Sequence, residues 1–186
     1  MYQAVIIGGS AGSFRVITSI LNALPKNYPM PLLLNLHRLK HVRSGFVEAL
    51  SIKSNIPVTE PYDKDSIKPG IAYLAPSNYH MYIELNKKIA LSTEETVNHS
   101  RPSIDLSFAT AAQTYHRNLL GIILSGANKD GARGLKKLKE AGGTAIVQNP
   151  EECEVATMSK AALDTSDVDY VYGTDQIINF LLKLKQ

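Results

Sequence analysis

The sequence places three side chains suited to nucleophilic acyl transfer at the ends of apolar runs. These side chains are Ser10, His37 and Asp130, and the runs that precede them are residues 3–8, 31–36 and 118–126. In acyl transfer a serine hydroxyl attacks a carbonyl carbon, an imidazole takes the hydroxyl proton, and a carboxylate holds the imidazole in the required tautomer. Ligands bind beyond the carboxyl ends of parallel strands, so we expect the three side chains to meet at one edge of a sheet.

The turn that holds Ser10 has the pattern of a nucleophile elbow. Residues 8–12 (GGSAG) match G-x-S-x-G, in which small neighbours permit a sharp strand-to-helix turn. In such a turn the backbone N–H of Ala11 points from a helix N-terminus toward a developing oxyanion. The pattern is short. Taken singly, Ser10 and Asp130 also fit a helix N-cap, and His37 fits a capping or partly exposed histidine. Their shared position at strand ends favours the catalytic interpretation.

A phosphate cradle is the alternative interpretation of this glycine-rich turn. A dinucleotide fingerprint requires G-x-G-x-x-G and a P-loop requires G-x-x-x-x-G-K-[ST], and the turn has neither spacing. Generic anion binding at the helix N-terminus is still open. The order Ser, His, Asp differs from the Ser, Asp, His order of α/β-hydrolases, so we expect a different fold. The other histidines rank below His37 because none directly follows a core strand: His41, His80, His99 and His116.

The elements that position these residues alternate between strand and helix. The first two runs are almost wholly apolar, which is typical of parallel strands that are covered on both faces, and the third run is predicted to be a further buried strand. Further strands are predicted at 144–149 and 168–172, and helices at 14–24, 44–51, 130–143, 156–163 and 174–185, with one more helix beginning at Pro102. This alternation predicts an α/β protein with a mostly parallel sheet and helices on both faces.

The middle of the chain interrupts this alternation. Four short strand candidates lie between residues 56 and 92, separated by turn signals at 68–70, 76–78 and 86–88. The candidates read IPVTE (56–60), IAYLA (71–75), YHMYIEL (79–85) and KIALS (88–92). We expect this segment to be a β-ribbon excursion beside the main sheet rather than a separate domain.

The composition is that of an ordinary globular protein. With 186 residues, of which 44% are hydrophobic, residues 1–186 are expected to form one domain. The net charge of +3 is too small to indicate a nucleic-acid partner. The single cysteine, Cys153, lies in an acidic setting, so we expect an inert thiol and a reducing compartment, the cytoplasm. No signal peptide is visible, and no apolar stretch reaches the ~20 residues that cross a bilayer.

Residues 37–43 (HRLKHVR) form a basic stretch after the second predicted strand. One interpretation is a solvated loop, and the other is a positive lip that attracts an acidic partner to the site. The stretch has no interleaved aromatic residues, which argues against a platform for single-stranded nucleic acid. No cysteine and histidine cluster suggests a metal, and no cofactor is expected.

Segments spread over most of the chain carry a resemblance to a known family. They read VIIGGSAGS (5–13), KPGIAYLAPSNYHM (68–81), SRPSIDLSF (100–108), GIILSGANKDGARGL (121–135) and AGGTAIVQNPEECEVATMSKAAL (141–163), with His37 at a strand end between the first two. Together they resemble the catalytic domain of the CheB-type protein-glutamate methylesterases of bacterial chemotaxis. The similarity extends from about Ala4 to about Leu163, and the order of the motifs makes it specific.

The resemblance implies a doubly wound α/β fold and hydrolysis of glutamate methyl esters on chemoreceptor helices, with release of methanol. Some members also deamidate glutamine. The implied partner is a methylated cytoplasmic chemoreceptor helix or a similarly acidic protein. The implied oxyanion donors are the backbone amides of Ala11 and Ala127, and Arg101 matches a segment near the pocket wall. The family's nucleophile, base and carboxylate fall on Ser10, His37 and Asp130.

Several departures from the family pattern concern the pocket and its surroundings. Residues 11–13 read AGS where the family has Thr-Gly-Gly, and residues 126–129 read GANK where it has Gly-Met-Gly-Asn. Arg38 replaces the family's methionine and becomes a candidate binding residue. These changes affect substrate choice more than the reaction. The receiver domain that usually precedes the catalytic domain is not in this sequence, which indicates a truncated form or a stand-alone member, and Met1 favours the second.

Two other functions are compatible with the same residues. One is a non-catalytic binding module of this fold that recognises acidic helices or phosphate through the basic stretch. The other is an esterase that acts on small esters or on another modified protein. Covalent labelling of a serine separates both hydrolases from the binding module, and methanol release from a methylated receptor fragment separates the two hydrolases.

Overall fold

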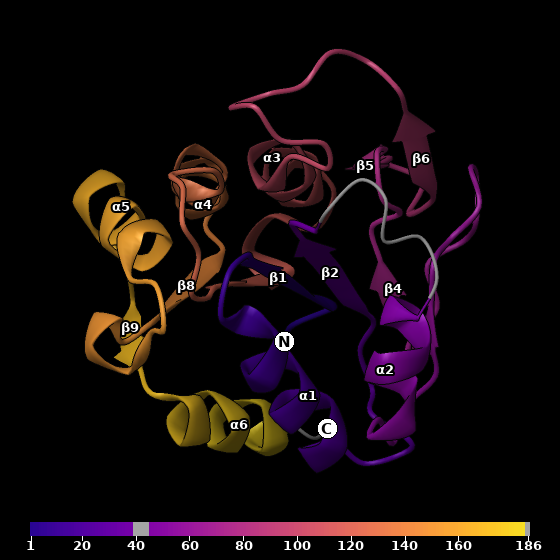
Figure 1. The fold of residues 1–186 in the computed structure, drawn as a ribbon. Helices are drawn as coiled ribbons and strands as arrows, with labels where there is room; N and C mark the ends of the chain where they lie inside the picture. The colour runs from indigo at the N-terminus through magenta and orange to yellow at the C-terminus, as the bar shows by residue number, and fades with distance from the viewer. Residues whose placement is uncertain (39–44, 185–186) are drawn as a thin grey trace.

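Seven parallel strands form the central sheet of the computed structural model, which describes residues 1–38 and 45–184 (Figure 1). The strand order is β3-β4-β2-β1-β7-β8-β9. The central strands β1, β2 and β7 are buried along their whole length, which agrees with their apolar sequences. The strands are β1 (Ala4–Gly9), β2 (Leu32–Leu36), β3 (Val58–Thr59), β4 (Ala72–Leu74), β7 (Leu119–Ile123), β8 (Thr144–Gln148) and β9 (Tyr170–Tyr172).

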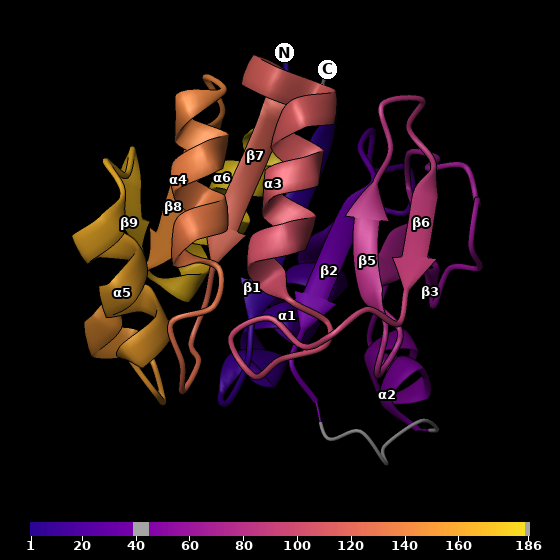
Figure 2. The same cartoon turned by 90° about the horizontal axis from the view of Figure 1, so that it is seen from above.

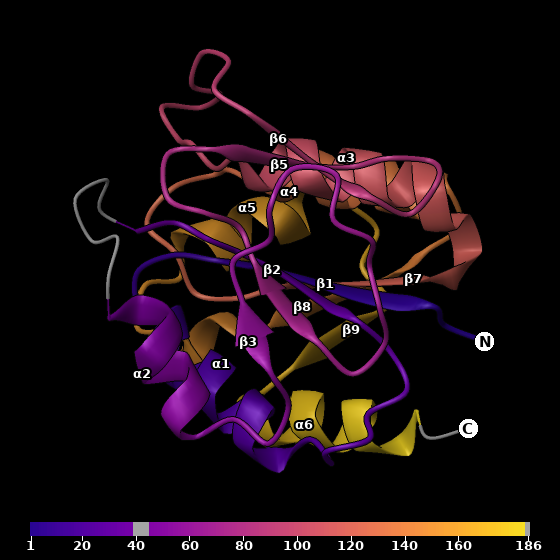
Figure 3. The same cartoon turned by 90° about the vertical axis from the view of Figure 1, so that its right-hand side faces the viewer.

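Helices cover both faces of the sheet, as Figure 3 shows. One face carries α1 (Ser13–Ala23), α2 (Phe46–Ile52) and α6 (Thr174–Lys183), and the other carries α3 (Ile104–Tyr115), α4 (Ala132–Glu140) and α5 (Thr157–Thr165). Side chains alternate along β1, so Val5 and Ile7 pack under the first set of helices and Ala4 and Ile6 under the second. The predicted parallel sheet with helices on both faces is confirmed.

The sheet is doubly wound, and its order of construction reverses between β1 and β7. From β1 the chain builds outward through β2 to the edge formed by β4 and β3, and it then returns to β7 and builds toward β9. β1, β2 and β7 point the same way in Figure 2, so their carboxyl ends meet at one edge. Such a reversal leaves a crevice outside the carboxyl ends of the flanking strands, which is where this kind of fold binds ligands.

The predicted β-ribbon near 56–92 is confirmed only over its second half. β5 (His80–Ile83) and β6 (Ile89–Ser92) form an antiparallel hairpin that packs on the α3 side of the sheet. In contrast, β3 and β4 join the main sheet, with β4 paired in parallel to both β2 and β3. The sequence did not show this because strands of two and three residues have too little pattern to identify their partner.

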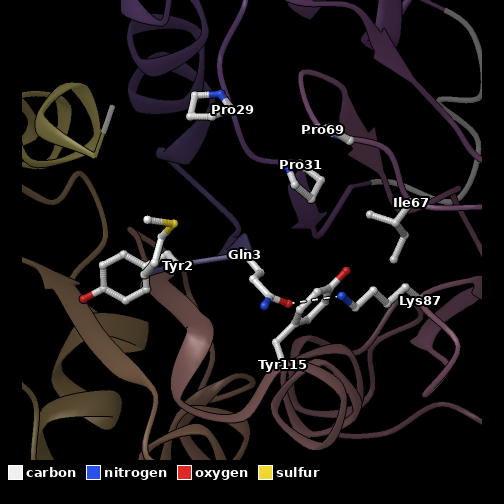
Figure 4. A pocket seen from close by; sticks show the side chains of 9 residues that line it. Tyr2, Gln3, Pro29, Pro31, Ile67, Pro69, Lys87 and Tyr115 are labelled. Atoms are coloured by element: carbon white, nitrogen blue, oxygen red, sulfur yellow. Dashed lines mark hydrogen bonds between the residues drawn. The ribbon is translucent and has the colours of Figure 1, made fainter. Parts of the chain in front are cut away.

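A cavity of about 390 Å³ lies at the amino ends of β1 and β2, opposite the edge where their carboxyl ends meet. Figure 4 shows the side chains that line it. It is lined by residues that precede β1 and β2, among them Gln3 and Pro31, and by Tyr115 at the end of α3. Lys87 crosses it, donating to Gln3 over 3.1 Å and lying 5.7 Å from the centre of the Tyr115 ring. The cavity is therefore separated from the strand ends that hold Ser10 and His37 by the length of the sheet.

The described part of the chain has neither a membrane-spanning helix nor a cluster of metal ligands. None of its helices is long and apolar enough to cross a membrane. Residues 1–38 and 45–184 also contain no group of three or more histidine, cysteine, aspartate or glutamate side chains placed to hold a metal ion.

Candidate active site

The backbone places Ser10 and His37 side by side at the carboxyl edge of the sheet. Gly9 and Leu36, the last residues of β1 and β2, are register partners, so the two candidates are the next residues along neighbouring strands. The His37 amide donates to the Gly9 carbonyl over 3.0 Å, and the Ser10 amide donates to the Ser125 carbonyl just beyond β7 over 2.9 Å. The first bond extends the pairing of β2 with β1, and the second joins β1 to β7 across the point where the winding of the sheet reverses.

His37 and Asp130 form a hydrogen-bonded pair across a gap of 93 positions in the sequence. His37 Nε2 lies 2.9 Å from Asp130 Oδ2. The imidazole is 12% exposed and the carboxylate is completely buried. The fold therefore brings together the predicted base and the predicted carboxylate, and the imidazole keeps a small exposed surface.

Asp130 is held as an anion by the N-terminus of α3. Its oxygens accept from the backbone N–H groups of Ile104 at 2.7 Å and Asp105 at 3.1 Å, and from the Ser103 hydroxyl at 3.1 Å. Burial alone would raise the pKa of Asp130, but the hydrogen bonds from His37 and from these amides outweigh it and hold the pKa below its ordinary value. The carboxylate is therefore an acceptor, so the His37 nitrogen that faces it carries the proton.

The second imidazole nitrogen faces the side chain of Asn128. Asn128 Nδ2 lies 3.3 Å from His37 Nδ1, and Asn128 Oδ1 accepts from the Asp130 backbone N–H over 3.1 Å. A backbone N–H can only donate, which fixes the orientation of the Asn128 amide and makes its nitrogen the donor to His37. With Nε2 protonated, the lone pair in the plane of the ring is on Nδ1, where it accepts from Asn128.

Ser10 is displayed by a tight turn and is not a helix cap. The N-cap of α1 is Gly12, with φ of 81°, and no side chain caps that helix. A Cβ on Gly12 would lie 2.5 Å from Glu154 Cβ, so the turn requires glycine both for its dihedral angle and for this close approach. The Ser10 hydroxyl has no hydrogen-bond partner within residues 1–38 and 45–184.

The capping interpretation of Asp130 is also wrong for its own helix. α4 begins after Gly131 and lacks a cap from Asp130. Instead, each carboxylate caps the other helix. Asp130, which precedes α4, accepts from the first backbone amides of α3. Asp105, in α3, accepts from the backbone amides of Gly131 at 2.9 Å and Gly134 at 2.7 Å at the start of α4. Asn98 Nδ2 bridges the two carboxylates, at 2.9 Å from Asp105 and 3.2 Å from Asp130.

Asp105 differs from Asp130 in its electrostatics. Burial raises the pKa of Asp105, and the nearby charge of Asp130 adds to the rise against the lowering effect of the Gly134 and Gly131 amides. Sequence reasoning missed Asp105, Asn98 and Asn128. Asp105 had only the signal of an acidic residue in the first turn of a helix, which does not reveal a second helix as its partner.

The amides of Ala11 and Ala127 are free to act as oxyanion donors. Both residues are exposed and flank the reversal point, one after β1 and the other after β7. Neither backbone N–H donates to an acceptor among the described residues. Ser125 ties the two turns together, since its hydroxyl donates to the Ala11 carbonyl over 2.7 Å.

The two candidate arginines have protein partners. Arg101 donates to Asn78 Oδ1 at 2.8 and 3.1 Å and to the carbonyls of Thr93 and Glu94 at 2.5 and 2.7 Å, which pins the chain after β6. Most of its donors are therefore occupied, and a binding role for Arg101 stays a prediction.

The side chain of Arg38 is buried rather than displayed at the surface. Its guanidinium pairs with Glu60, donates to the Ala75 carbonyl over 2.7 Å, and lies 5.1 Å from the centre of the Phe46 ring. A binding role for Arg38 also stays a prediction. The rest of the predicted basic stretch, residues 39–43, lies outside the described residues.

The competing reactive side chains are engaged elsewhere. His80 is fully buried, accepts from the Ser103 amide at 3.1 Å, and uses its other nitrogen to donate to the Glu95 carbonyl at 2.9 Å. Burial raises the pKa of the Cys153 thiol, which disfavours the reactive thiolate.

Comparisons with known proteins identify the class to which this fold and site belong. The family model for CheB methylesterase matches residues 5–181, and the chain therefore belongs to the CheB methylesterase family. It superposes on the crystal structure of the catalytic domain of CheB methylesterase from Thermotoga maritima with a TM-score of 0.93 and 32% sequence identity, covering 100% of both chains. The resemblance seen in the sequence and the doubly wound fold that it implied are confirmed.

Two curated relatives differ in how much of their length this chain matches. A putative protein-glutamate methylesterase/protein-glutamine glutaminase from Leptospira interrogans is 42% identical over 185 residues, which cover 100% of this chain and 96% of the relative. The protein-glutamate methylesterase/protein-glutamine glutaminase from Thermotoga maritima is 33% identical over 98% of this chain but only 54% of the relative. Relatives therefore match both at nearly full length and over about half their length.

Proposed function

We propose that this chain is a serine hydrolase that removes methyl groups from glutamate methyl esters in proteins, with glutamine deamidation as a second reaction. Relatives that match nearly all of this chain carry both activities in their names. The observation that carries the proposal is the hydrogen bond between His37 and Asp130. His37 directly follows β2, and Ser10 directly follows β1, the neighbouring strand. A histidine that is hydrogen-bonded to a carboxylate and lies beside a serine supports a base that activates the serine hydroxyl.

The proposed reaction proceeds through acylation of Ser10 and hydrolysis of the acyl-enzyme. Ser10 Oγ attacks the ester carbonyl carbon while its proton passes to His37 Nδ1, and the amides of Ala11 and Ala127 bind the oxyanion that forms. The proton then passes to the methoxy oxygen, methanol leaves, and an acyl-enzyme remains. Water then attacks the acyl-enzyme while Nδ1 takes one of its protons. The bond from the acyl carbon to Ser10 Oγ breaks, Nδ1 returns the proton to Oγ, and the glutamate side chain leaves as a carboxylic acid that ionises. General-base assistance supplies about 10²–10⁴-fold, and one oxyanion donor about 3–4 kcal/mol.

Asp130 contributes to this reaction by staying charged. When Nδ1 takes the serine proton, the imidazole becomes a cation between the crevice and the buried carboxylate. A buried anion 2.9 Å from Nε2 stabilises that cation strongly, because the surroundings screen the attraction poorly. The amides of Ile104 and Asp105 keep Asp130 ionised, and a carboxylate oxygen has lone pairs enough for Oδ2 to accept from both Ile104 and His37.

The proposed partner is a methylated helix from the cytoplasmic part of a chemoreceptor, or a similarly acidic protein. The proposed location of the reaction is the cytoplasm. The names of the relatives support a protein glutamate as the substrate. We further propose that residues 1–186 act as one catalytic domain, since both core clusters lie against the same sheet. An ester on a small molecule is the competing substrate that the assay must distinguish.

Methanol release from a methylated chemoreceptor fragment tests this proposal. Wild-type protein is expected to release methanol in proportion to the methyl groups lost, whereas Ser10→Ala releases none and keeps its far-ultraviolet circular dichroism. Small methyl esters serve as the comparison substrate. The proposal is wrong if Ser10→Ala retains the wild-type rate, or if the protein hydrolyses small esters and leaves methylated receptor intact.

A further inference from the structure

The resting site leaves the serine unpaired and the base occupied. The Ser10 hydroxyl has no hydrogen-bond partner among the described residues, while the Nδ1 lone pair of His37 accepts from Asn128 Nδ2. An imidazole nitrogen of this kind has one lone pair in the plane of its ring. The atom that must take the Ser10 proton is therefore already engaged by another donor.

We propose that Asn128 is a positioning residue that competes with Ser10 for His37 and must release Nδ1 before the serine can be deprotonated. This inference rests on the proposed function. In the resting state the Asn128 amide fixes the neutral tautomer, with the proton on Nε2 and the lone pair on Nδ1. In the reactive state the same lone pair receives the Ser10 proton, and the Asn128 amide has moved away.

The geometry indicates that little free energy is needed to separate the Asn128 amide from His37 Nδ1. The Asn128 contact to His37 is 3.3 Å long, beyond the usual 2.9–3.0 Å of an N–H donor. Asn128 is only partly buried and stands between two exposed residues, Ala127 and Lys129. Its second donor contact, to Ser100 Oγ, is also long at 3.4 Å. The amide oxygen at the other side of the group accepts from the Asp130 backbone N–H at 3.1 Å.

The loop that holds Asn128 links substrate binding to the release of His37 Nδ1 by the Asn128 amide. Ala127, whose backbone N–H is a proposed oxyanion donor, directly precedes Asn128. A carbonyl oxygen that docks on the Ala127 amide thus contacts the loop that holds the competing donor. Binding of substrate at this amide and departure of the Asn128 amide from Nδ1 therefore involve neighbouring residues of one segment.

The rate at which a fluorophosphonate modifies Ser10 tests the competition. In this reaction Ser10 Oγ bonds to phosphorus, fluoride leaves, and the hydroxyl proton goes to His37 Nδ1. Asn128→Ala removes the competing donor and is expected to raise the second-order rate about three- to tenfold, the factor that one neutral hydrogen bond corresponds to. Asn128→Gly is expected to behave in the same way and serves if the alanine variant does not fold. Ser100→Ala removes the other partner of the amide and is expected to leave the rate unchanged.

A nitrogen-15 spectrum of the His37 ring tests the contact itself. Asn128→Ala is expected to shift the Nδ1 resonance toward that of an unbonded imidazole nitrogen and to leave the Nε2 resonance in place. An Nδ1 resonance that Asn128→Ala leaves unchanged overturns the contact and the competition with it.

The labelling rates separate failure of this inference from failure of the proposed function. A wild-type protein that labels at the same rate as Asn128→Ala and Asn128→Gly, or faster, overturns the competition while the proposed function stands. A protein that labels in neither the wild type nor the Asn128 variants overturns the proposed function, and the competition that rests on it.

Discussion

At the scale of single residues, Asp130 does two things with one carboxylate. It accepts hydrogen bonds from His37 Nε2 and from the first backbone N–H groups of α3, so the same group orients the imidazole and caps a helix. Because the helix end stabilises negative charge, Asp130 stays ionised although no solvent reaches it. A neutral isostere can fill the space but cannot stabilise the imidazolium cation.

Asp130→Asn is therefore expected to reduce kcat for methyl ester hydrolysis by about 10³–10⁴-fold, because the amide favours the wrong imidazole tautomer. The measurement is methanol release under saturating substrate, with folding monitored by circular dichroism. A reduction of less than tenfold would show that the reaction does not depend on this carboxylate. Lys136→Gln, on the exposed surface of α4, serves as a charge-changing control that leaves kcat unchanged.

The same carboxylate makes stability depend on pH with a definite sign. Its folded-state pKa is below the unfolded value, so its contribution to stability is present above the unfolded value of about 3.9 and is lost as pH falls through the folded value. Urea unfolding of the wild type and of Asp130→Asn at pH 7 and pH 3 isolates this contribution. The free energy of unfolding should fall more between the two pH values in the wild type, and an equal fall in both proteins contradicts the assignment.

At the scale of elements, the tight turn between β1 and α1 determines where Ser10 points. Gly12 combines a positive φ with a close approach to Glu154. Gly45, before α2, has a similar φ of 87°, but a Cβ added there would have no atom within 4 Å. The two glycines thus separate the cost of the dihedral angle from the cost of the contact.

Gly12→Ala should accordingly lower the free energy of unfolding by more than Gly45→Ala, for which the dihedral angle alone costs about 1–2 kcal/mol. Gly12→Ala should also reduce hydrolysis, because the Ser10 hydroxyl and the Ala11 amide move with the turn. Chemical denaturation and kcat measured on both variants check this pair of expectations. Equal stability losses, with activity intact in Gly12→Ala, would argue against a turn that is fixed by contact with Glu154.

The sequence predicted those elements whose pattern is local. β1, β2 and β7 were readable as apolar runs, and α1 as residues with helical spacing, because burial of a central strand or of one helix face leaves a mark on consecutive residues. Strand-end position then indicated Ser10, His37 and Asp130. β3 and β4 were not placed, because their partners are set by the whole sheet. The sequence also did not predict the contacts of Asn98, Asp105 and Asn128. These contacts join loops and helices that only the folded chain brings together.

At the scale of the whole molecule, the candidate site lies at one end of the sheet. The carboxyl ends of the central strands carry the candidate site, whereas the cavity that Lys87 crosses lies toward their amino ends. The N-terminus lies at this same amino end (Figure 2). A doubly wound sheet makes these two ends unequal, because only one of them collects the strand-to-helix turns at the reversal point.

Lys87→Ala is therefore expected to leave kcat and KM for methyl ester hydrolysis within about twofold of the wild type, since surface substitutions away from a site have small effects. Its ammonium contacts Gln3 and the Tyr115 ring, both of which lie at the amino ends of the strands. Steady-state kinetics on the purified variant measure the effect. A tenfold loss would mean that the cavity at the amino ends takes part in catalysis.

The role of Ser10 is tested most directly by the position of a covalent adduct after reaction with a fluorophosphonate, located by peptide mass spectrometry. We expect the adduct on Ser10 in the wild type, no adduct in Ser10→Ala, and labelling slowed by at least about a hundredfold in His37→Gln, within the range that general-base assistance supplies. An adduct on any other side chain, or undiminished labelling of His37→Gln, would contradict the assignment of Ser10 as a nucleophile that His37 activates.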